Sequence, residues 1–167
     1  MASILGIAIT DFTGVFSIPS GTYVDQNILD LIDQEEERIL IDLLGWKLFD
    51  EFRTALAGTP AAKWTDLRDG DQYGTSPTLY NFKGVKQMII YFVWYQYTRF
   101  LGASNTKVGI RVKDGTNSVE NSSVKSMKLI RGYNEGIKIY HNAYCYIIDK
   151  GTYDDQIYTP KEEIGLL

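Results

Sequence analysis

The residues best suited to chemistry are His141 and Cys145, the single histidine and the single cysteine of the chain. They stand four residues apart, a separation that puts two ligands on one face of a helix. A zinc site needs three or four protein ligands, and no further His or Cys exists to supply them. We therefore expect no metal there and interpret His141 as a packing residue whose ring is satisfied by a hydrogen bond.

Carboxylates form the other candidate sites. Asp66, Asp69 and Asp71 fall in the short stretch DLRDGDQYG, but its spacing lacks the glycine and the terminal glutamate of a calcium loop, so an ordinary turn is expected. Runs of adjacent acids could be acid–base pairs, yet neighbouring helix residues do not face each other, and we interpret the runs as solvated faces. They are Glu35–Glu37, Asp154–Asp155 and Glu162–Glu163.

A catalytic centre cannot be assembled from these parts. The sequence has no phosphate-binding loop and no dinucleotide fingerprint, and no candidate site provides a nucleophile, a base and an orienting group together. We predict a protein that is not an enzyme and has no cofactor. An enzyme with an unrecognised carboxylate site stays open as an alternative.

Composition predicts one globular domain in a reducing compartment. The chain has 167 residues and a net charge of −4, which gives no basic field for binding duplex DNA. The N-terminus lacks the basic region of a secretory signal, and a lone cysteine fits a reducing environment. The chain has twelve tyrosines, an unusually high number. Tyrosine combines a large apolar ring with a hydroxyl, so it suits surfaces that are buried against a partner.

The most apolar stretch, MIIYFVWYQYTRF, starts at Met88. The run to Leu101 has fourteen residues, whereas a membrane-spanning helix needs about 20. Its apolar residues surround the whole helix, which is typical of an element enclosed by other protein. We predict a buried helix and no membrane segment.

The fold class predicted is mainly α, a four- to five-helix bundle with extended N- and C-terminal arms. Residues 1–24 form the N-terminal arm, with a weak strand signal from Leu5 to Ile9, and 151–167 the C-terminal tail. Asp25 is a good cap for the first helix. The segment 64–84 is expected to be turn-rich. Helices are predicted at about 25–44, 46–56, 82–102 and 121–150.

The last helix should carry a continuous seam at helical spacing, and Gly132 and Gly136 should allow a neighbouring backbone to approach closely. The seam residues are Met127, Ile130, Asn134, Ile137, His141, Tyr144 and Ile148.

A β-hairpin at about 107–120 should separate the last two long helices. Alternation from 107 to 113 predicts its first strand, and Asp114–Gly115 its turn. Lys107, Arg111 and Lys113 would share one face of that strand. The simplest interpretation is an edge protected by basic residues; contact with an acidic neighbour or with passing DNA is the alternative.

The order of several segments resembles the head–tail connector proteins (adaptor, or head-completion proteins) of tailed bacteriophages. ILIDLLGWKLFDEF looks like the junction of that family's first two helices, KWTDLRDGDQY like its tryptophan-led turn, and NFKGVKQMIIYFVWYQYTRF like its aromatic helix. KVGIRV, VENSS and RGYNEG follow in the expected order. The resemblance covers roughly 27–150.

This resemblance implies a structural virion protein, made in the host cytoplasm and placed in the neck. Its copies would form a ring, twelvefold in this family, below the portal protein and above tail or further neck proteins. Genomic DNA would pass through the lumen without specific binding. The family contributes no catalytic residues.

From the residues themselves, we expect both ends of the chain to contact partners, because they hold apolar groups that a small bundle would leave exposed. Together with the basic hairpin, the candidate contacts are Phe12, Phe16, Lys107, Arg111, Lys113, Ile157, Tyr158, Ile164, Leu166 and Leu167. The alternative function is a small soluble binding or regulatory protein with an aromatic ligand cleft.

Overall fold

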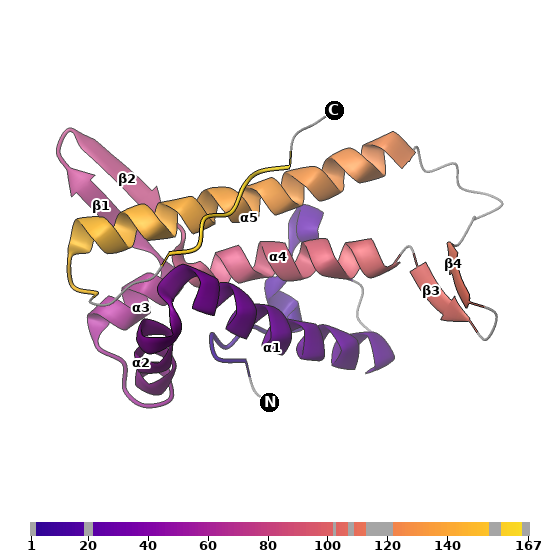
Figure 1. Ribbon diagram of the computed structural model, residues 1–167, viewed down its shortest axis with the longest axis horizontal. Helices are drawn as coiled ribbons and strands as arrows, with labels where there is room; N and C mark the ends of the chain where they lie inside the picture. The colour runs from indigo at the N-terminus through magenta and orange to yellow at the C-terminus, as the bar shows by residue number, and fades with distance from the viewer. Residues whose placement is uncertain are drawn as a thin grey trace.

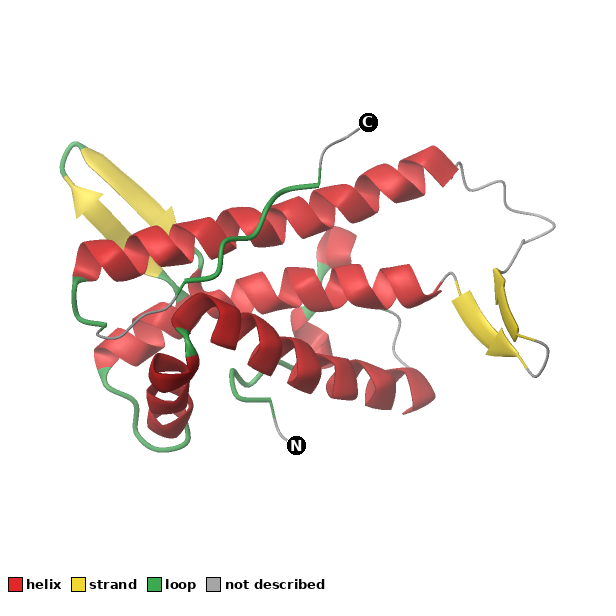
Figure 2. Cartoon of the chain, viewed as in Figure 1, coloured by secondary structure: helices red, strands yellow, loops and turns green. Residues whose placement is uncertain are grey.

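The computed structural model describes residues 3–18, 22–101, 103–106, 109–112, 122–153 and 158–164. The chain is mainly helical, as predicted, with two small antiparallel hairpins (Figures 1 and 2). The helices are α1 (Thr22–Leu44), α2 (Trp46–Leu56), α3 (Ala62–Asp69), α4 (Gly84–Leu101) and α5 (Ser122–Lys150). The strands are β1 (Asp71–Thr75), β2 (Thr78–Phe82), β3 (Ala103–Thr106) and β4 (Gly109–Val112).

Helix α4 is the centre of the core, as its composition predicted. It packs against α5 on one side and against α1 and α3 on the other. Val85, Met88 and Val93 are fully buried, and Phe92 and Trp94 are each 3% exposed. Within the described residues, no helix combines the length and apolarity that crossing a membrane requires.

Helices α1 and α2 follow each other in the chain and pack against each other, and α1 also packs against α4. The buried face of α1 includes Ile28, Ile32 and Leu43, which are completely buried. Gly45 separates the two helices with a φ of 75°, a left-handed conformation that glycine adopts without strain. Helix α1 begins at Thr22, so the predicted cap Asp25 lies inside its first turn.

The N-terminal segment is not the strand that alternation suggested. Two short 3₁₀ helices occur at Ile9–Asp11 and Gly14–Phe16, and Leu5 and Ile7 are 2% and 4% exposed. Alternation failed as a strand signal because no neighbouring strand pairs with the described part of this segment. Instead, the Glu36 carboxylate of α1 accepts hydrogen bonds from backbone amides of this segment.

The turn-rich segment is more regular than predicted. It folds into α3 and the β1–β2 hairpin, whose register runs from Asp71↔Phe82 to Thr75↔Thr78. At the base of the hairpin, a Cβ added at Gly70 would lie 2.4 Å from the Phe82 carbonyl oxygen, and one at Gly84 2.4 Å from that of Arg68. Gly70 and Gly84, which suggested loops in the sequence, therefore allow the backbone of 68–70 to lie in direct contact with the backbone of 82–84.

The second hairpin lies between α4 and α5, as predicted, but its pairing differs. Strand β4 pairs with the preceding β3, from Ala103↔Val112 to Thr106↔Gly109. The predicted turn at Asp114–Gly115 stays a prediction, because it lies outside the described residues. Residues 107–108 and 113–121 lie outside the described part of the chain.

Helix α5 turns a different face to the core than its predicted seam. Met127 and Ile148 are 51% and 60% exposed, and Ile137 alone of the seam is fully buried. The reason is that Gly132 and Gly136 leave room on α5 for two aromatic rings of α4. A Cβ at Gly132 would lie 2.6 Å from the Trp94 ring, and one at Gly136 3.2 Å from the Phe92 ring. The expected close approach exists, but aromatic rings of α4 make it.

Candidate interaction surfaces

His141 and Cys145 are both exposed, so His141 is not the buried packing residue that we predicted. Its predicted hydrogen bond exists: Nε2 lies 2.8 Å from the Lys161 carbonyl oxygen. Across the residues with described positions, no three His, Cys, Asp or Glu side chains form a group that could hold a metal ion.

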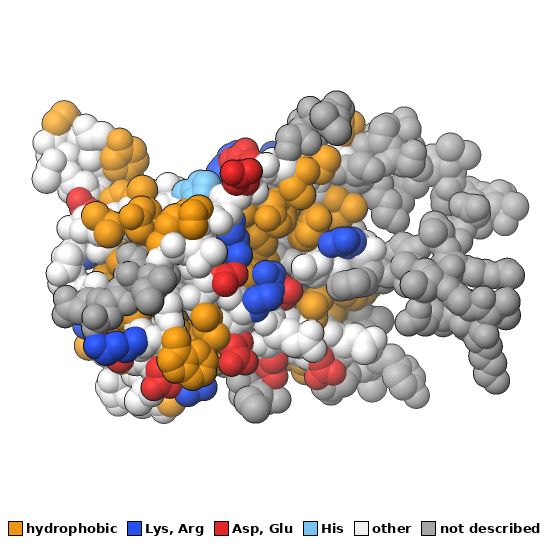
Figure 3. All heavy atoms as spheres, in the orientation of Figure 1, with side chains coloured by type: hydrophobic (Ala, Val, Ile, Leu, Met, Phe, Trp, Pro, Cys, Tyr) orange, Lys and Arg blue, Asp and Glu red, His pale blue; other side chains and the backbone are white. Residues whose placement is uncertain are grey.

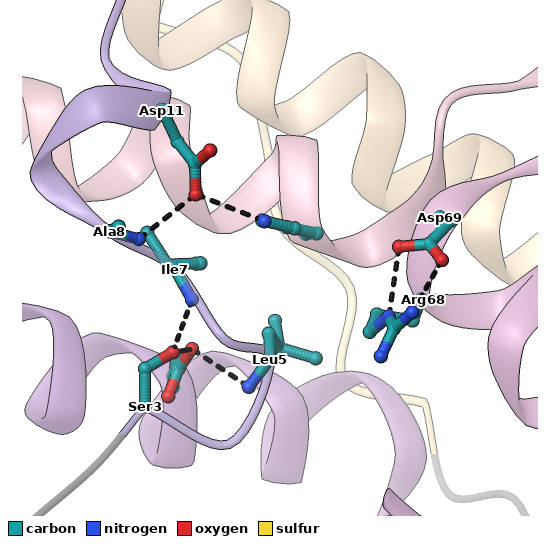
Figure 4. A network of polar contacts seen from close by, with 9 residues as sticks. Ser3, Leu5, Ile7, Ala8, Asp11, Arg68 and Asp69 are labelled. Atoms are coloured by element: carbon teal, nitrogen blue, oxygen red, sulfur yellow. Dashed lines mark hydrogen bonds and ion pairs between the residues drawn. The ribbon is translucent and has the colours of Figure 1, made fainter. Parts of the chain in front are cut away.

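The aspartates near α3 are engaged separately by cations. Asp69 pairs with Arg68 at 2.7 Å (Figure 4), and Asp71 pairs with Lys150 of α5 at 2.8 Å. A side-chain hydrogen bond from each partner is the main cause of the lowered pKa of both carboxyl groups. A polar hollow of about 580 Å³ lies beside them. These ion pairs hold the base of the β1–β2 hairpin, so we assign Asp69 and Asp71 a structural role.

One acidic run is not the solvated face that we predicted, because Glu36 is 0% exposed and Glu35 only 7% exposed. The Glu36 carboxylate accepts hydrogen bonds from the Ser3 hydroxyl at 2.5 Å and from the amides of Ile4 and Leu5 at 2.8 and 3.2 Å. Figure 4 shows this end of the chain folded over α1. Burial raises the pKa of Glu36, while the three hydrogen bonds oppose that rise. The residue fastens the N-terminal segment.

The N-terminal candidates for partner contact belong to the chain's own core. Phe12 is 4% exposed, and the Phe16 ring packs edge-on against Tyr91 and Trp94 with centroids 4.7 and 5.0 Å apart. An ion pair of 3.0 Å between Asp11 and Lys86 closes the same segment onto α4. The expectation that the bundle leaves these two phenylalanines free was therefore wrong.

The tail segment, residues 158–164, lies along α5 and crosses to α1 (Figure 1). Hydrophobic side chains gather on this face of the molecule (Figure 3). Tyr158 stacks on Tyr144 with centroids 4.1 Å apart. The Thr159 amide donates to the Asp42 carbonyl at 2.8 Å, and the Tyr140 hydroxyl donates to the Thr159 carbonyl at 2.6 Å.

Two further contacts hold the tail segment. Lys161 pairs with the Asp42 carboxylate at 2.6 Å. The Asn134 amide group donates to the Ile164 carbonyl at 3.0 Å and accepts from the Ile164 amide at 2.9 Å. We call the receiving residues the tail track; they are Asp42, Asn134, Tyr140, His141 and Tyr144. Three of them, Asn134, His141 and Tyr144, belong to the predicted seam of α5. That part of the seam therefore lies on the face that binds the tail segment.

The remaining candidates are only partly described. Ile164 is 37% exposed. Arg111 lies in β4, where the backbone alone is described, and Lys107, Lys113, Ile157, Leu166 and Leu167 lie outside the described residues.

The exposed apolar residues that sequence reasoning missed lie on the β1–β2 hairpin and on α2. Leu79 and Tyr80 are 56% and 53% exposed, and Trp46 is 58% exposed. Tyr80 stacks on Tyr73, which is 9% exposed and anchors the hairpin to the body. Figure 2 shows the hairpin projecting from the helices. Tyrosine and tryptophan side chains such as Tyr80 and Trp46 are frequent anchors of protein interfaces. No alternation of apolar and polar residues marks Thr78–Phe82, where Leu79 and Tyr80 are adjacent and only Phe82 is buried. The sequence therefore held no local signal that could have located them.

Comparison with known proteins gives a family match only. Residues 40–143, more than half of the chain, match the profile of a family described as a family of unknown function (DUF6712). No curated protein and no solved structure matches the chain.

Proposed function

The chain belongs to the DUF6712 family, and we propose that it is a head–tail connector: a structural virion protein that forms a ring below the portal and extends the DNA channel. The proposal rests on the resemblance described above together with the surfaces of the folded chain. Its immediate partners are further copies of the chain, the portal protein and tail or neck proteins.

The motif order agrees with the elements of the fold. ILIDLLGWKLFDEF contains the break at Gly45 between α1 and α2, and the aromatic motif coincides with α4. The tryptophan-led motif contains Trp64, which is 7% exposed and packs against Phe52 and Tyr153. The resemblance therefore involves segments that build the core.

One observation carries the proposal: large apolar residues are exposed on a hairpin that projects from a well-packed body. Leu79 and Tyr80 are more than half exposed, although their hairpin is anchored by Tyr73. A surface at one end of a molecule that binds a different surface of the next copy is a heterologous contact, and such contacts form a ring when the rotation between copies closes. We assign this hairpin to the contact between neighbouring copies.

The ends of the chain have changed roles in the proposal. Phe12 and Phe16 support the core and are no longer candidates for partner contact. The tail candidates Ile157, Ile164, Leu166 and Leu167, and the basic residues near the second hairpin, stay proposed contacts to partners. The net charge of −4 suits a lumen that DNA passes without tight binding.

The rival function, a binding protein with an aromatic cleft, is not favoured by any observation. Such a cleft needs open access to the rings of α4, but Phe92 and Trp94 are 3% exposed and lie against the glycines of α5.

Sedimentation with the purified portal protein of the same phage tests the proposal. A connector should co-sediment with the portal as a ring-sized complex, and negative-stain images of that complex should show an added ring. A protein that stays at the top of the gradient at every concentration would overturn the proposal.

A further inference from the structure

The outer side of α1 carries a row of carboxylates. Asp30, Asp33 and Glu37 recur at helical spacing, whereas Ile28 on the opposite side of the helix is completely buried. Figure 3 shows acidic side chains along α1 on this face of the molecule. We call the three residues the acidic stripe; Leu29 lies about a quarter turn away from Asp30 and is not part of it. Helix α1 as a whole has seven carboxylates and a single arginine, so its surface is strongly negative.

Helix α5 carries the opposite charge near its start. Lys128 and Arg131 are exposed and stand three residues apart, so they are neighbours on the helix surface. Glu135 pairs with Lys138 at 3.1 Å, and Glu163 of the tail segment lines a hollow together with Arg131. Three cations against two carboxylates leave this surface positive. We call Lys128 and Arg131 the basic pair; neither residue belongs to the tail track.

The tail segment shows which parts of α1 and α5 lie level with each other. The two helices lie on different sides of α4 and run in the same direction across the molecule (Figure 1). Thr159 bridges them, because its amide donates to the Asp42 carbonyl of α1 and its carbonyl accepts from the Tyr140 hydroxyl of α5. Asp42 and Tyr140 are therefore level along the two helices.

The acidic stripe and the basic pair are level as well. Asp30 and Lys128 each stand twelve residues before the positions that Thr159 bridges, which is about 18 Å along either helix at 1.5 Å per residue. Asp33 and Arg131 each stand nine residues before them. A second copy that is shifted across the helices, from α1 towards α5, would therefore bring its carboxylates to the level of these cations.

We propose that α1 of one copy faces α5 of the next copy in the ring, with the acidic stripe against the basic pair. This inference rests on the proposed ring and names its two contact faces. Opposite charges at matching levels fix the register of such a contact and speed its formation. The β1–β2 hairpin packs on α5, and Trp46 follows α1 directly in the chain. Exposed apolar side chains therefore accompany the charges at both helices.

A hollow beside the acidic stripe suits the side chain of Arg131 from the next copy. Its volume is about 270 Å³, and its lining includes Asp33 and Glu37 together with the apolar Phe49. Arg53, a cation in the same lining, already has an ion pair of its own. An arginine side chain combines an apolar stem with a planar cation that matches a carboxylate. The same carboxylates repel phosphate, so this surface does not suit DNA.

Charge reversal with recovery tests this contact. One protein carries Lys128→Glu and Arg131→Glu, a second carries Asp30→Lys and Asp33→Lys, and a third carries all four substitutions. Each protein is assembled with the portal protein of the same phage, and sedimentation measures the amount in the ring fraction. Lys83→Glu, at an exposed position between β2 and α4, is the control and should assemble as the wild type does. Urea midpoints of the isolated proteins show that each is folded.

The first and second proteins should each lose ring formation by at least about ten-fold, because like charges would face each other across the contact. The third protein should recover most of the lost assembly, as should an equal mixture of the first two, in which the copies alternate. Reversals that leave assembly unchanged, or a folded third protein that does not recover, would overturn the pairing of these faces and leave the ring standing. A wild-type protein that forms no ring would overturn the proposed function and this inference with it.

Discussion

At the scale of single residues, two positions decide how the segments fit together. The sequence predicted close packing at one of them, Gly132, but it identified the packing partner of neither. Glu36 sits in an acidic run that resembles a solvated surface, yet it binds the amides of Ile4 and Leu5. Gly132 lowers helix propensity, yet it provides the space for the Trp94 ring. Both effects depend on a partner far away in the sequence, which local patterns do not contain.

Gly132→Ala should destabilise the protein by up to about 2 kcal/mol. Alanine improves helix propensity by about 1 kcal/mol, but its Cβ would lie 2.6 Å from the Trp94 ring, and overpacking a core costs about 1–3 kcal/mol. Gly136→Ala is the matched comparison, because its Cβ would meet the Phe92 ring at 3.2 Å, and it should be near neutral. Urea unfolding measures the stability of both variants. Equal losses of stability would contradict the explanation that Gly132 makes room for the Trp94 ring.

Glu36 should make stability depend on pH in a definite direction. Its pKa is raised above the usual 4.5, chiefly by burial, so the folded protein holds this proton more tightly than the unfolded chain. The resulting stability is complete below about pH 4.5 and is lost as pH rises through the raised pKa. Glu36→Gln does not titrate there. Hence the unfolding free energy of the wild type, relative to this variant, should fall as pH rises.

Urea unfolding of the wild type and Glu36→Gln between pH 4 and pH 7 checks this dependence. Glu37→Gln, at the exposed neighbouring position, is the control and should follow the wild type. A free-energy difference between wild type and Glu36→Gln that stays constant across the range would show that Glu36 does not titrate as its burial requires.

At the scale of elements, helical periodicity worked where a helix has one dominant apolar face. It placed α1, α2, α4 and α5 within a few residues of their bounds. It failed for α3 and the β1–β2 hairpin, where Gly70 and Gly84 looked like loop residues. It also assigned the wrong buried face to α5, because that helix has two apolar faces, one for α4 and one for the tail segment.

Asn134→Ala should release the far end of the tail segment without affecting the bundle. The Ile164 amide loses its acceptor, a loss of roughly 1 kcal/mol, so its hydrogen exchange should accelerate about five-fold. The Thr159 amide, bonded to Asp42 at 2.8 Å, should keep its rate, as should the urea midpoint. Asn142→Ala is the control. An unchanged Ile164 rate, or acceleration throughout the bundle, would contradict this picture of the tail track.

At the scale of the whole molecule, the sequence predicted a helical body with contacts at its ends, and the structure divides those contacts differently. The N-terminal segment is part of the core, because Glu36, Tyr91 and Trp94 receive it. Exposed apolar groups lie on the β1–β2 hairpin, on α2 and on α5, as Leu79, Trp46 and Ile148 show. No composition rule distinguishes these cases, since the apolar residues of both segments look alike before the chain folds.

Replacing Leu79 and Tyr80 together by serine should weaken ring formation at least ten-fold while the isolated protein stays folded. Both side chains are more than half exposed, so little apolar surface of the monomer is lost, whereas interface anchors carry much of an association energy. Leu29→Ser, at 39% exposure on α1, is the control and should assemble normally. Analytical ultracentrifugation at several concentrations measures the difference; identical association of the double variant and the wild type would remove the hairpin from the interface.

Imaging of mature phage particles that carry a labelled copy of this protein tests the proposed connector role most directly. The account predicts label at the neck of every tailed particle, on a ring between the portal and the tail, and heads that lack tails when the protein is missing. Fully infectious particles that contain none of the labelled protein would contradict it.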